Sequence, residues 1–171
     1  MPVRYSCAVC GGTHVGLPDI GFDRPWYWRD ELTGDPHSRL TADLCVIEGR
    51  DHFIRCVLEV PIIGKGAALG WGVWLSQSKA NFDLYAATFE EPEPAERETV
   101  GYLSNRLPGY PDTLALVMKA HWRRGRRPLL EPKPVEHPLV ADWRTGIDIE
   151  QAIGFVAPIL HPGGDALRPA P

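Results

Sequence analysis

A β-hairpin is predicted by the sequence LTADLCVIEGRDHFIRCVLEVPI, residues 40–62. Two runs rich in β-branched and other apolar residues, 40–48 and 52–62, flank the turn-forming segment 49–51. A third run, LGWGVWL at residues 69–75, alternates large apolar side chains with glycine and tryptophan. We therefore expect three adjacent antiparallel strands at the centre of the fold.

The register of this hairpin determines which face each cysteine occupies. If Glu48 pairs with Asp51 across a two-residue turn, Cys45 lies opposite Ile54 and shares a face with Cys56, because side chains alternate along a strand. A one-residue change in the length of the loop places Cys56 on the opposite face. In either register Cys45 lies within an apolar run.

The hydrophobic period changes from two to about 3.6 after residue 76. Phe82, Tyr85 and Phe89 then recur at helical spacing, which predicts an amphipathic helix over 79–90 that packs on the strands. The other predicted elements are strands at 99–103 and 114–122, an extended segment at 128–134, and helices at 137–144 and 149–160 capped by His137-Pro138 and Asp148. The pattern indicates the α+β class: an antiparallel sheet with a Cys-x-x-Cys N-terminal loop, one mid-chain helix and a C-terminal helix.

Length and composition indicate one globular domain over residues 1–171, with 44% hydrophobic and 23% charged residues. We divide it into a zinc-knuckle-like loop at 1–24, mainly strands with helix 79–90 at 40–122, a helical part at 137–161 and a frayed tail at 162–171. The net charge of −4 argues against nucleic-acid binding. No apolar run reaches the length of a membrane span or a signal peptide, so we expect a soluble cytoplasmic protein with reduced thiols.

A metal-binding loop is predicted by CAVCGGTH, residues 7–14. Cys7 and Cys10 are spaced so that both sulfurs can reach one ion, and Gly11 allows the backbone to turn its N–H groups towards them. His14 is a third candidate ligand within the same loop. Zinc is the expected metal, and a redox pair is disfavoured because no βαβ pattern precedes the cysteines.

A closed zinc site needs four ligands, and the chain has no second Cys-x-x-Cys. The missing ligands must come from His14, Cys45, Cys56 or a distant histidine. Cys45 is either a ligand or a small core residue. The scattered histidines, His121, His137 and His161, are interpreted as structural rather than catalytic.

Residues 123–127, RRGRR, contain four arginines beside Trp122. Such a segment can contact phosphate or stack on a base. The alternative, which we favour, is a solvated turn balanced by the acidic segment 90–98.

Several sequence blocks carry a resemblance to a known family. In chain order they are CAVCG (7–11), GLP (16–18), LTADLCVI (40–47), FIR (53–55), LEVPI (58–62), WGVW (71–74), NF (81–82), LPGYP (107–111) and HPL (137–139). The chain resembles the bacterial domain-of-unknown-function family numbered 2199 over nearly its whole length. The resemblance implies no activity, but it implies that the block containing Cys45 (40–47) belongs with the block containing Cys7 and Cys10 (7–11). At Cys56 it implies a small residue such as glycine, which argues against a shared ligand there.

Three functional hypotheses follow. The first is a non-enzymatic binding module with a structural zinc, whose partner is a protein; in it we expect Cys45 to approach the knuckle. The second is a zinc-dependent hydrolase-type enzyme with Cys7, Cys10 and either His14 or Cys45 as ligands and a water at an open position. The third is a metal-free protein with reduced structural thiols. The number of protein ligands distinguishes the first two hypotheses.

Overall fold

The structure is a computed structural model that describes residues 2–89 and 97–162. The expected acidic loop at 90–94 and the tail from residue 163 lie outside these residues. Within them the chain is α+β, as predicted, with three α-helices and a mostly antiparallel sheet.

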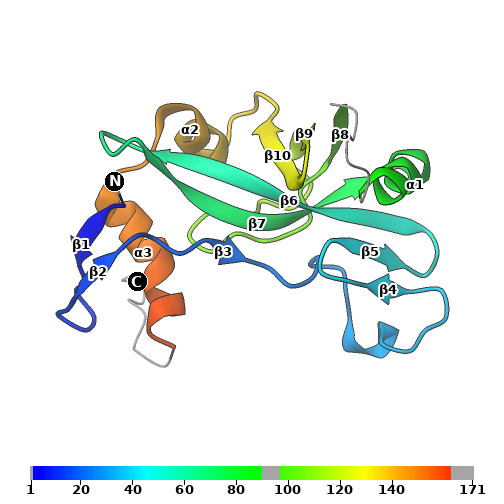
Figure 1. The fold of residues 1–171 in the computed structure, drawn as a ribbon, viewed down its shortest axis with the longest axis horizontal. Coiled ribbons are helices and arrows are strands. Elements are labelled where there is room, and N and C mark those ends of the chain that lie inside the picture. Colours follow the sequence, from blue (N-terminus) through cyan, green and yellow to red (C-terminus); the bar gives the residue numbers. More distant parts are fainter. Residues whose placement is uncertain (1, 90–96, 163–171) are drawn as a thin grey trace.

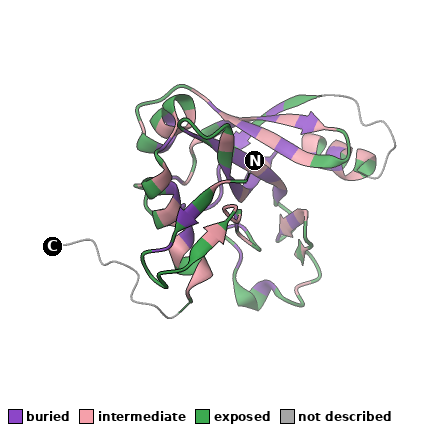
Figure 2. Ribbon diagram, turned by 60° about the vertical axis from the view of Figure 1, so that its left-hand side comes forward, coloured by how far each residue is buried: buried purple, intermediate pink, exposed green. Residues whose placement is uncertain are grey.

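A long central hairpin organises the molecule (Figure 1). Its strands β6 (Asp51–Ile62) and β7 (Ala67–Gln77) pair antiparallel along their whole length, from His52 opposite Gln77 to Ile62 opposite Ala67. Buried residues are concentrated in these strands, as Figure 2 shows. The prediction of strands at 52–62 and 69–75 is confirmed, and both strands extend beyond the predicted limits.

The main sheet has the strand order β3-β7-β6-β10-β9-β8, with β5 pairing on β6 and β4 on β5. The added strands are β3 (Ile20–Gly21), β4 (Arg39–Leu40), β5 (Leu44–Ile47), β8 (Glu98–Tyr102), β9 (Val117–Arg123) and β10 (Arg126–Pro132). Two contacts are parallel, β3 with β7 and β10 with β6. The expected antiparallel sheet is confirmed in most of its contacts; the two parallel ones could not be predicted, because side-chain alternation within a strand carries no information on the direction of its neighbour.

The sheet curls until β8 returns to β7. Leu75 and Leu103 form an antiparallel bridge, and the Tyr102 N–H donates to Ser76 Oγ at 2.9 Å. A Cβ atom on Gly101 would lie 1.9 Å from the Ser76 carbonyl oxygen, so only glycine fits at this approach.

The segment after β8 is held by buried Asn105. Its Oδ1 accepts from the Trp74 N–H at 2.7 Å, and its Nδ2 donates to the Arg24 carbonyl at 3.0 Å. This one amide joins three segments that are distant in sequence.

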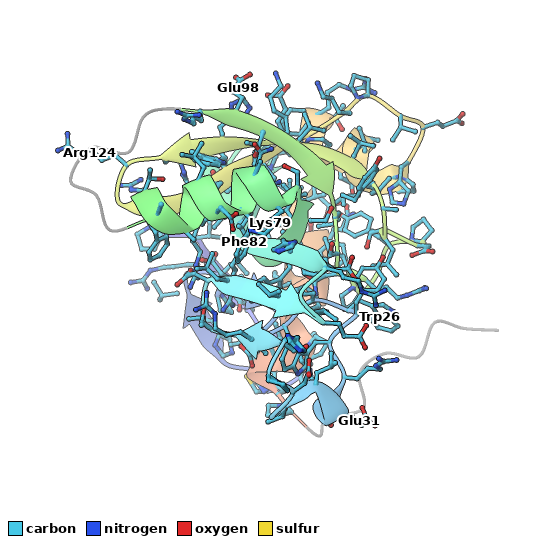
Figure 3. All side chains as sticks on the ribbon, turned by 90° about the vertical axis from the view of Figure 1, so that its right-hand side faces the viewer. Trp26, Glu31, Lys79, Phe82, Glu98 and Arg124 are labelled. Carbon is cyan, nitrogen blue, oxygen red and sulfur yellow. The ribbon has the colours of Figure 1, made fainter. Side chains whose placement is uncertain are left out.

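Helix α1 (Lys79–Thr88) begins at Ser78, whose side chain accepts from the Asn81 N–H. Phe82 and Tyr85 are buried, as predicted, and Figure 3 shows α1 lying against the strands. The prediction that Phe89 packs on the sheet is wrong. The helix ends at Thr88, so Phe89 is left 44% exposed, in contact with the ring of Tyr85.

The last two helices are α2 (Pro138–Thr145) and α3 (Ile149–Leu160). His137 caps α2 by accepting from the Leu139 N–H at Nδ1, which confirms its structural role. Asp148 caps α3 by accepting from the Gln151 N–H. Pro158 lies in the last turn of α3, where the helix ends.

The loop between β5 and β6 has three residues, because Ile47 pairs with Asp51. Glu48 and Gly49 both adopt positive φ, which brings Glu48 into the loop. Cys45 consequently lies opposite Phe53, not Ile54, and the two-residue turn is incorrect. Cys45 and Cys56 belong to different hydrophobic clusters.

Candidate metal centre

The N-terminal loop forms a small hairpin of β1 (Arg4–Ser6) and β2 (Thr13–Val15). The Cys7 N–H donates to the Gly12 carbonyl and the Gly11 N–H donates to the Cys7 carbonyl, both at 2.8 Å. Gly11 has a φ of 69°, which the sequence predicted. The loop is therefore a tight turn from which the two cysteine side chains converge.

Four side chains meet at this hairpin: Cys7, Cys10, His14 and His161. Their potential ligand atoms all lie within 4.8 Å of one another. Cys7 Sγ is 3.1 Å from His161 Nε2, and Cys10 Sγ is 3.3 Å from His14 Nε2. Around tetrahedral zinc, with bonds of about 2.0–2.3 Å, ligand atoms are separated by roughly 3.3–3.8 Å. The four residues are thus close enough to hold one metal ion.

His161 reaches the site from the other end of the chain, 154 residues after Cys7. It is the C-cap residue of α3, where its backbone N–H donates to the Ala157 carbonyl. Figure 1 shows the β1–β2 hairpin beside this helix. The spacing of the N-terminal loop predicted His14 and left a distant histidine open as a ligand, but it did not select His161, since no motif links a histidine after a C-terminal helix to a distant Cys-x-x-Cys.

Aromatic and backbone groups surround the four residues. The ring of Tyr5 stacks on His14 at 5.4 Å, and His14 meets His161 edge-on at 5.7 Å. Hydrogen bonding from the Cys10 backbone is the main effect that lowers the pKa of Cys7, against the opposing effect of burial. The Gly12 N–H also points at Cys10 Sγ, at 3.4 Å. Backbone N–H groups aimed at sulfur are suited to stabilising thiolates.

The exposure of the four residues differs. Cys7 is buried, His14 and His161 are half-buried, and Cys10 is exposed. The group lies where the hairpin meets the helix, so an ion there would cross-link the two ends of the chain. Two thiolates and two imidazoles would supply four protein ligands, the number that a closed zinc site needs.

Cys45 does not join this group, which corrects the placement expected from the sequence. It is fully buried in an apolar cluster with Trp28, Phe53 and Trp74. Burial raises the pKa of the Cys45 thiol to about 12. Cys56 is also fully buried, and burial raises the pKa of its thiol. Both are packing residues, since each is fully buried in a hydrophobic cluster. The three-residue loop directs Cys45 towards the aromatic cluster.

In the described part of the chain, no second set of three or more Cys, His, Asp or Glu side chains is grouped closely enough for a metal. His121 lies between two carboxylates, 2.7 Å from Glu131 and 3.1 Å from Glu98, in an ion-pair network across β8–β10. None of the described helices is long and apolar enough to cross a membrane.

Comparison with known proteins identifies one family. Residues 6–147 match the model of a family described as uncharacterized proteins conserved in bacteria, DUF2199. No curated protein and no solved structure matches the chain. The matched region includes Cys7, Cys10 and His14 but ends before α3, so His161 lies outside it.

Proposed function

The chain belongs to this bacterial family, DUF2199, and from that premise we propose that it is a binding module stapled by a structural zinc ion. The observation that carries the proposal is the set of four ligand atoms within 4.8 Å of one another. Four protein ligands favour a closed structural site, whereas a catalytic zinc keeps a position for water.

Zinc suits this donor set better than other common metals. Two thiolates and two imidazoles are soft and borderline donors, a set typical of zinc rather than of magnesium or calcium, which require oxygen ligands.

A structural zinc ion here would stabilise the short β1–β2 hairpin. Strands β1 and β2 have three residues each, and an isolated two-stranded hairpin of this size is at best marginally stable in water. A zinc ion ligated by Cys7, Cys10 and His14 on the hairpin and by His161 on α3 holds the hairpin against the helix. Part of the free energy of metal binding thereby stabilises the folded protein.

Cobalt substitution distinguishes the closed site from the open site of a hydrolase. We expect purified protein to contain one zinc per chain, and the Co²⁺ form to show the intense visible absorption of a tetrahedral thiolate site. His161→Ala should open one position and shift the spectrum towards higher coordination. His137→Ala, which removes a histidine that caps α2, should leave the spectrum unchanged. A spectrum that does not respond to His161→Ala would support the three-ligand enzyme, and protein that binds neither metal would support the metal-free alternative.

For the binding surface of the module we propose a groove whose lining includes none of the four candidate metal ligands. A groove of about 510 Å³ is walled by Tyr27, Phe53 and Tyr102, with Tyr27 and Phe53 stacked at 6.0 Å. Tyr102 is 56% exposed. Aromatic residues of this kind are enriched at protein interfaces.

Backbone strain is concentrated at the same groove. Glu48 and Ala115 are the two non-glycine residues with positive φ in the described part of the chain, at 50° and 63°, and both line the groove. Such conformations cost free energy and cluster at functional sites. Of the charged lining residues, Glu48 is paired with Arg29 and with neighbouring Arg50, which leaves the carboxylate of Asp51 for a protein segment that carries a basic side chain next to an apolar one.

A paired substitution tests this surface. Tyr27→Ser with Tyr102→Ser should abolish the capture of a specific protein from the lysate of the source bacterium, because it removes two aromatic walls while leaving the zinc ligands intact. Val135→Ser with Ile159→Ser, which changes exposed apolar residues elsewhere, is the matched control. Equal capture by both double variants would exclude the groove as the interface.

A further inference from the structure

A second cavity, of about 340 Å³, lies between the end of α1 and the turn that joins β9 to β10. Its lining combines arginines from that turn with the aromatic residues Tyr85, Phe89 and Trp122. The volume lies within the range of small-molecule sites. Figure 3 shows this end of the molecule, with Arg124 projecting outward at the turn.

The charge of the cavity is positive. Arg123, Arg126 and Arg127 line it, and Asp43 is the one acidic lining residue within 2–89 and 97–162. Asp43 is already engaged, because Arg127 Nε donates to its Oδ1 at 2.6 Å. Burial is the main cause that lowers the pKa of neighbouring Arg55; the charge of Arg127 adds to this effect, and the charges of Asp23 and Asp43 oppose it.

Two of these arginines differ in their freedom to bind a ligand. Arg123 is held by the Arg127 carbonyl, to which its Nε and Nη2 donate at 3.0 and 2.7 Å. Arg126 is exposed and forms no side-chain ion pair or hydrogen bond with the residues that the structure describes. A guanidinium group can bind a carboxylate or phosphate through two parallel hydrogen bonds.

The aromatic side of the cavity supplies a surface for a ring. Tyr85 meets both Trp122 and Phe89 edge-on, with centroids 5.1 and 5.7 Å apart. Trp122 and Tyr85 are buried, whereas Phe89 is 44% exposed. An exposed aromatic side chain contiguous with buried ones is suited to covering a planar ligand.

The hydroxyl group of Tyr85 is the strongest sign of a missing partner. Tyr85 is only 5% exposed, and its Oη is buried without a hydrogen-bond partner among the described residues. Burial is the main cause that raises the pKa of this hydroxyl. Of the two charged residues that also line the cavity, Asp43 raises this pKa further and Arg127 lowers it. A buried polar group without a partner is costly, so a ligand atom that accepts from it would recover that free energy.

We propose that this cavity binds a small anionic ligand in which a planar ring carries a phosphate or carboxylate group. The anionic group is bound by Arg126 and by the hydroxyl of Tyr85, and the ring packs on Phe89 and Trp122. This inference is independent of the zinc site and of the groove at Tyr27 and Tyr102. Arginine binds phosphate and carboxylate through the same paired hydrogen bonds, so the experiment decides between the two groups.

Calorimetric titration with four probes, three small anions and an oligonucleotide, tests the ligand class. Phenyl phosphate and benzoate represent the two anions on a ring, and inorganic phosphate lacks the ring. We expect phenyl phosphate or benzoate to bind at least about tenfold more tightly than inorganic phosphate, and the binding to weaken at higher salt. Equal affinity for inorganic phosphate would contradict the role of the ring. Tight binding of an oligonucleotide without terminal phosphate would instead indicate a nucleic-acid surface.

Two variants test the residues. Arg126→Gln and Tyr85→Phe should each weaken the better probe by roughly tenfold, the effect of losing one hydrogen bond to a charged group. Tyr85→Phe should not lower the melting temperature, because the hydroxyl it removes has no partner in the folded protein. Arg39→Gln, at an exposed arginine of β4, is the control and should bind like the unaltered protein. Unchanged affinity in both cavity variants would overturn the proposal.

Discussion

Cys7→Ser is expected to abolish zinc binding and to lower the free energy of unfolding by about 3 kcal/mol or more, since metal binding supplies part of the stability. For a chain of 171 residues this corresponds to a fall in melting temperature of roughly 6–12 °C. Metal analysis and thermal denaturation of the same samples provide both measurements.

Chelation separates loss of the metal from loss of packing at buried Cys7. Adding EDTA should lower the melting temperature of the unaltered protein towards that of Cys7→Ser, while Cys7→Ser itself should not respond. Cys45→Ser is the matched control. It should retain one zinc per chain and lose only about 1–3 kcal/mol, the cost of a hydroxyl in an apolar cluster. Loss of zinc from Cys45→Ser would return Cys45 to the ligand set and contradict the assignment of His161.

Gly101→Ala is expected to have the second large effect, a loss of about 3 kcal/mol or more. The added methyl group would lie 1.9 Å from the Ser76 carbonyl oxygen, and a backbone atom held in a strand cannot move aside as a side chain can. The substitution must separate β8 from β7, because the core has no room for the added methyl group. Urea denaturation of the variant measures the loss.

Gly154→Ala is the control for this prediction. Gly154 lies within α3, and a Cβ atom there would meet nothing within 4 Å. Alanine should therefore raise the free energy of unfolding by about 0.5–1 kcal/mol, the difference in helix propensity. If Gly101→Ala were as stable as the unaltered protein, the close approach of β8 to β7 would be wrong.

The local elements were largely predictable because their signals are local. Alternation predicted β6 and β7, the change of hydrophobic period after residue 76 predicted the start of α1, and His137 and Asp148 predicted the starts of α2 and α3. The end of α1 was missed by two residues, and this misplaced Phe89. Helix ends depend on tertiary packing more than on the residues that form them.

Three of the four residues in the candidate site were predictable from the sequence. Cys7, Cys10, Gly11 and His14 lie within eight consecutive residues, so their spacing alone brings them together. The choice between Cys45 and a distant histidine depended on the strand register. Glu48 takes a positive φ, which lengthens the loop by one residue and turns Cys45 towards Phe53 and Trp74.

The sequence by itself determined the α+β class, the central hairpin, the helix caps and the three-residue core of the metal loop, because each is encoded by neighbours in the chain. Only the tertiary structure decided that His161 completes the site and that the arginines at the β9–β10 turn share a cavity with Tyr85. His161 and Cys7 are separated by 154 residues, and the contact between them arises from the packing of α3 beside the β1–β2 hairpin. No local pattern records such a contact, since it depends on how every intervening element folds.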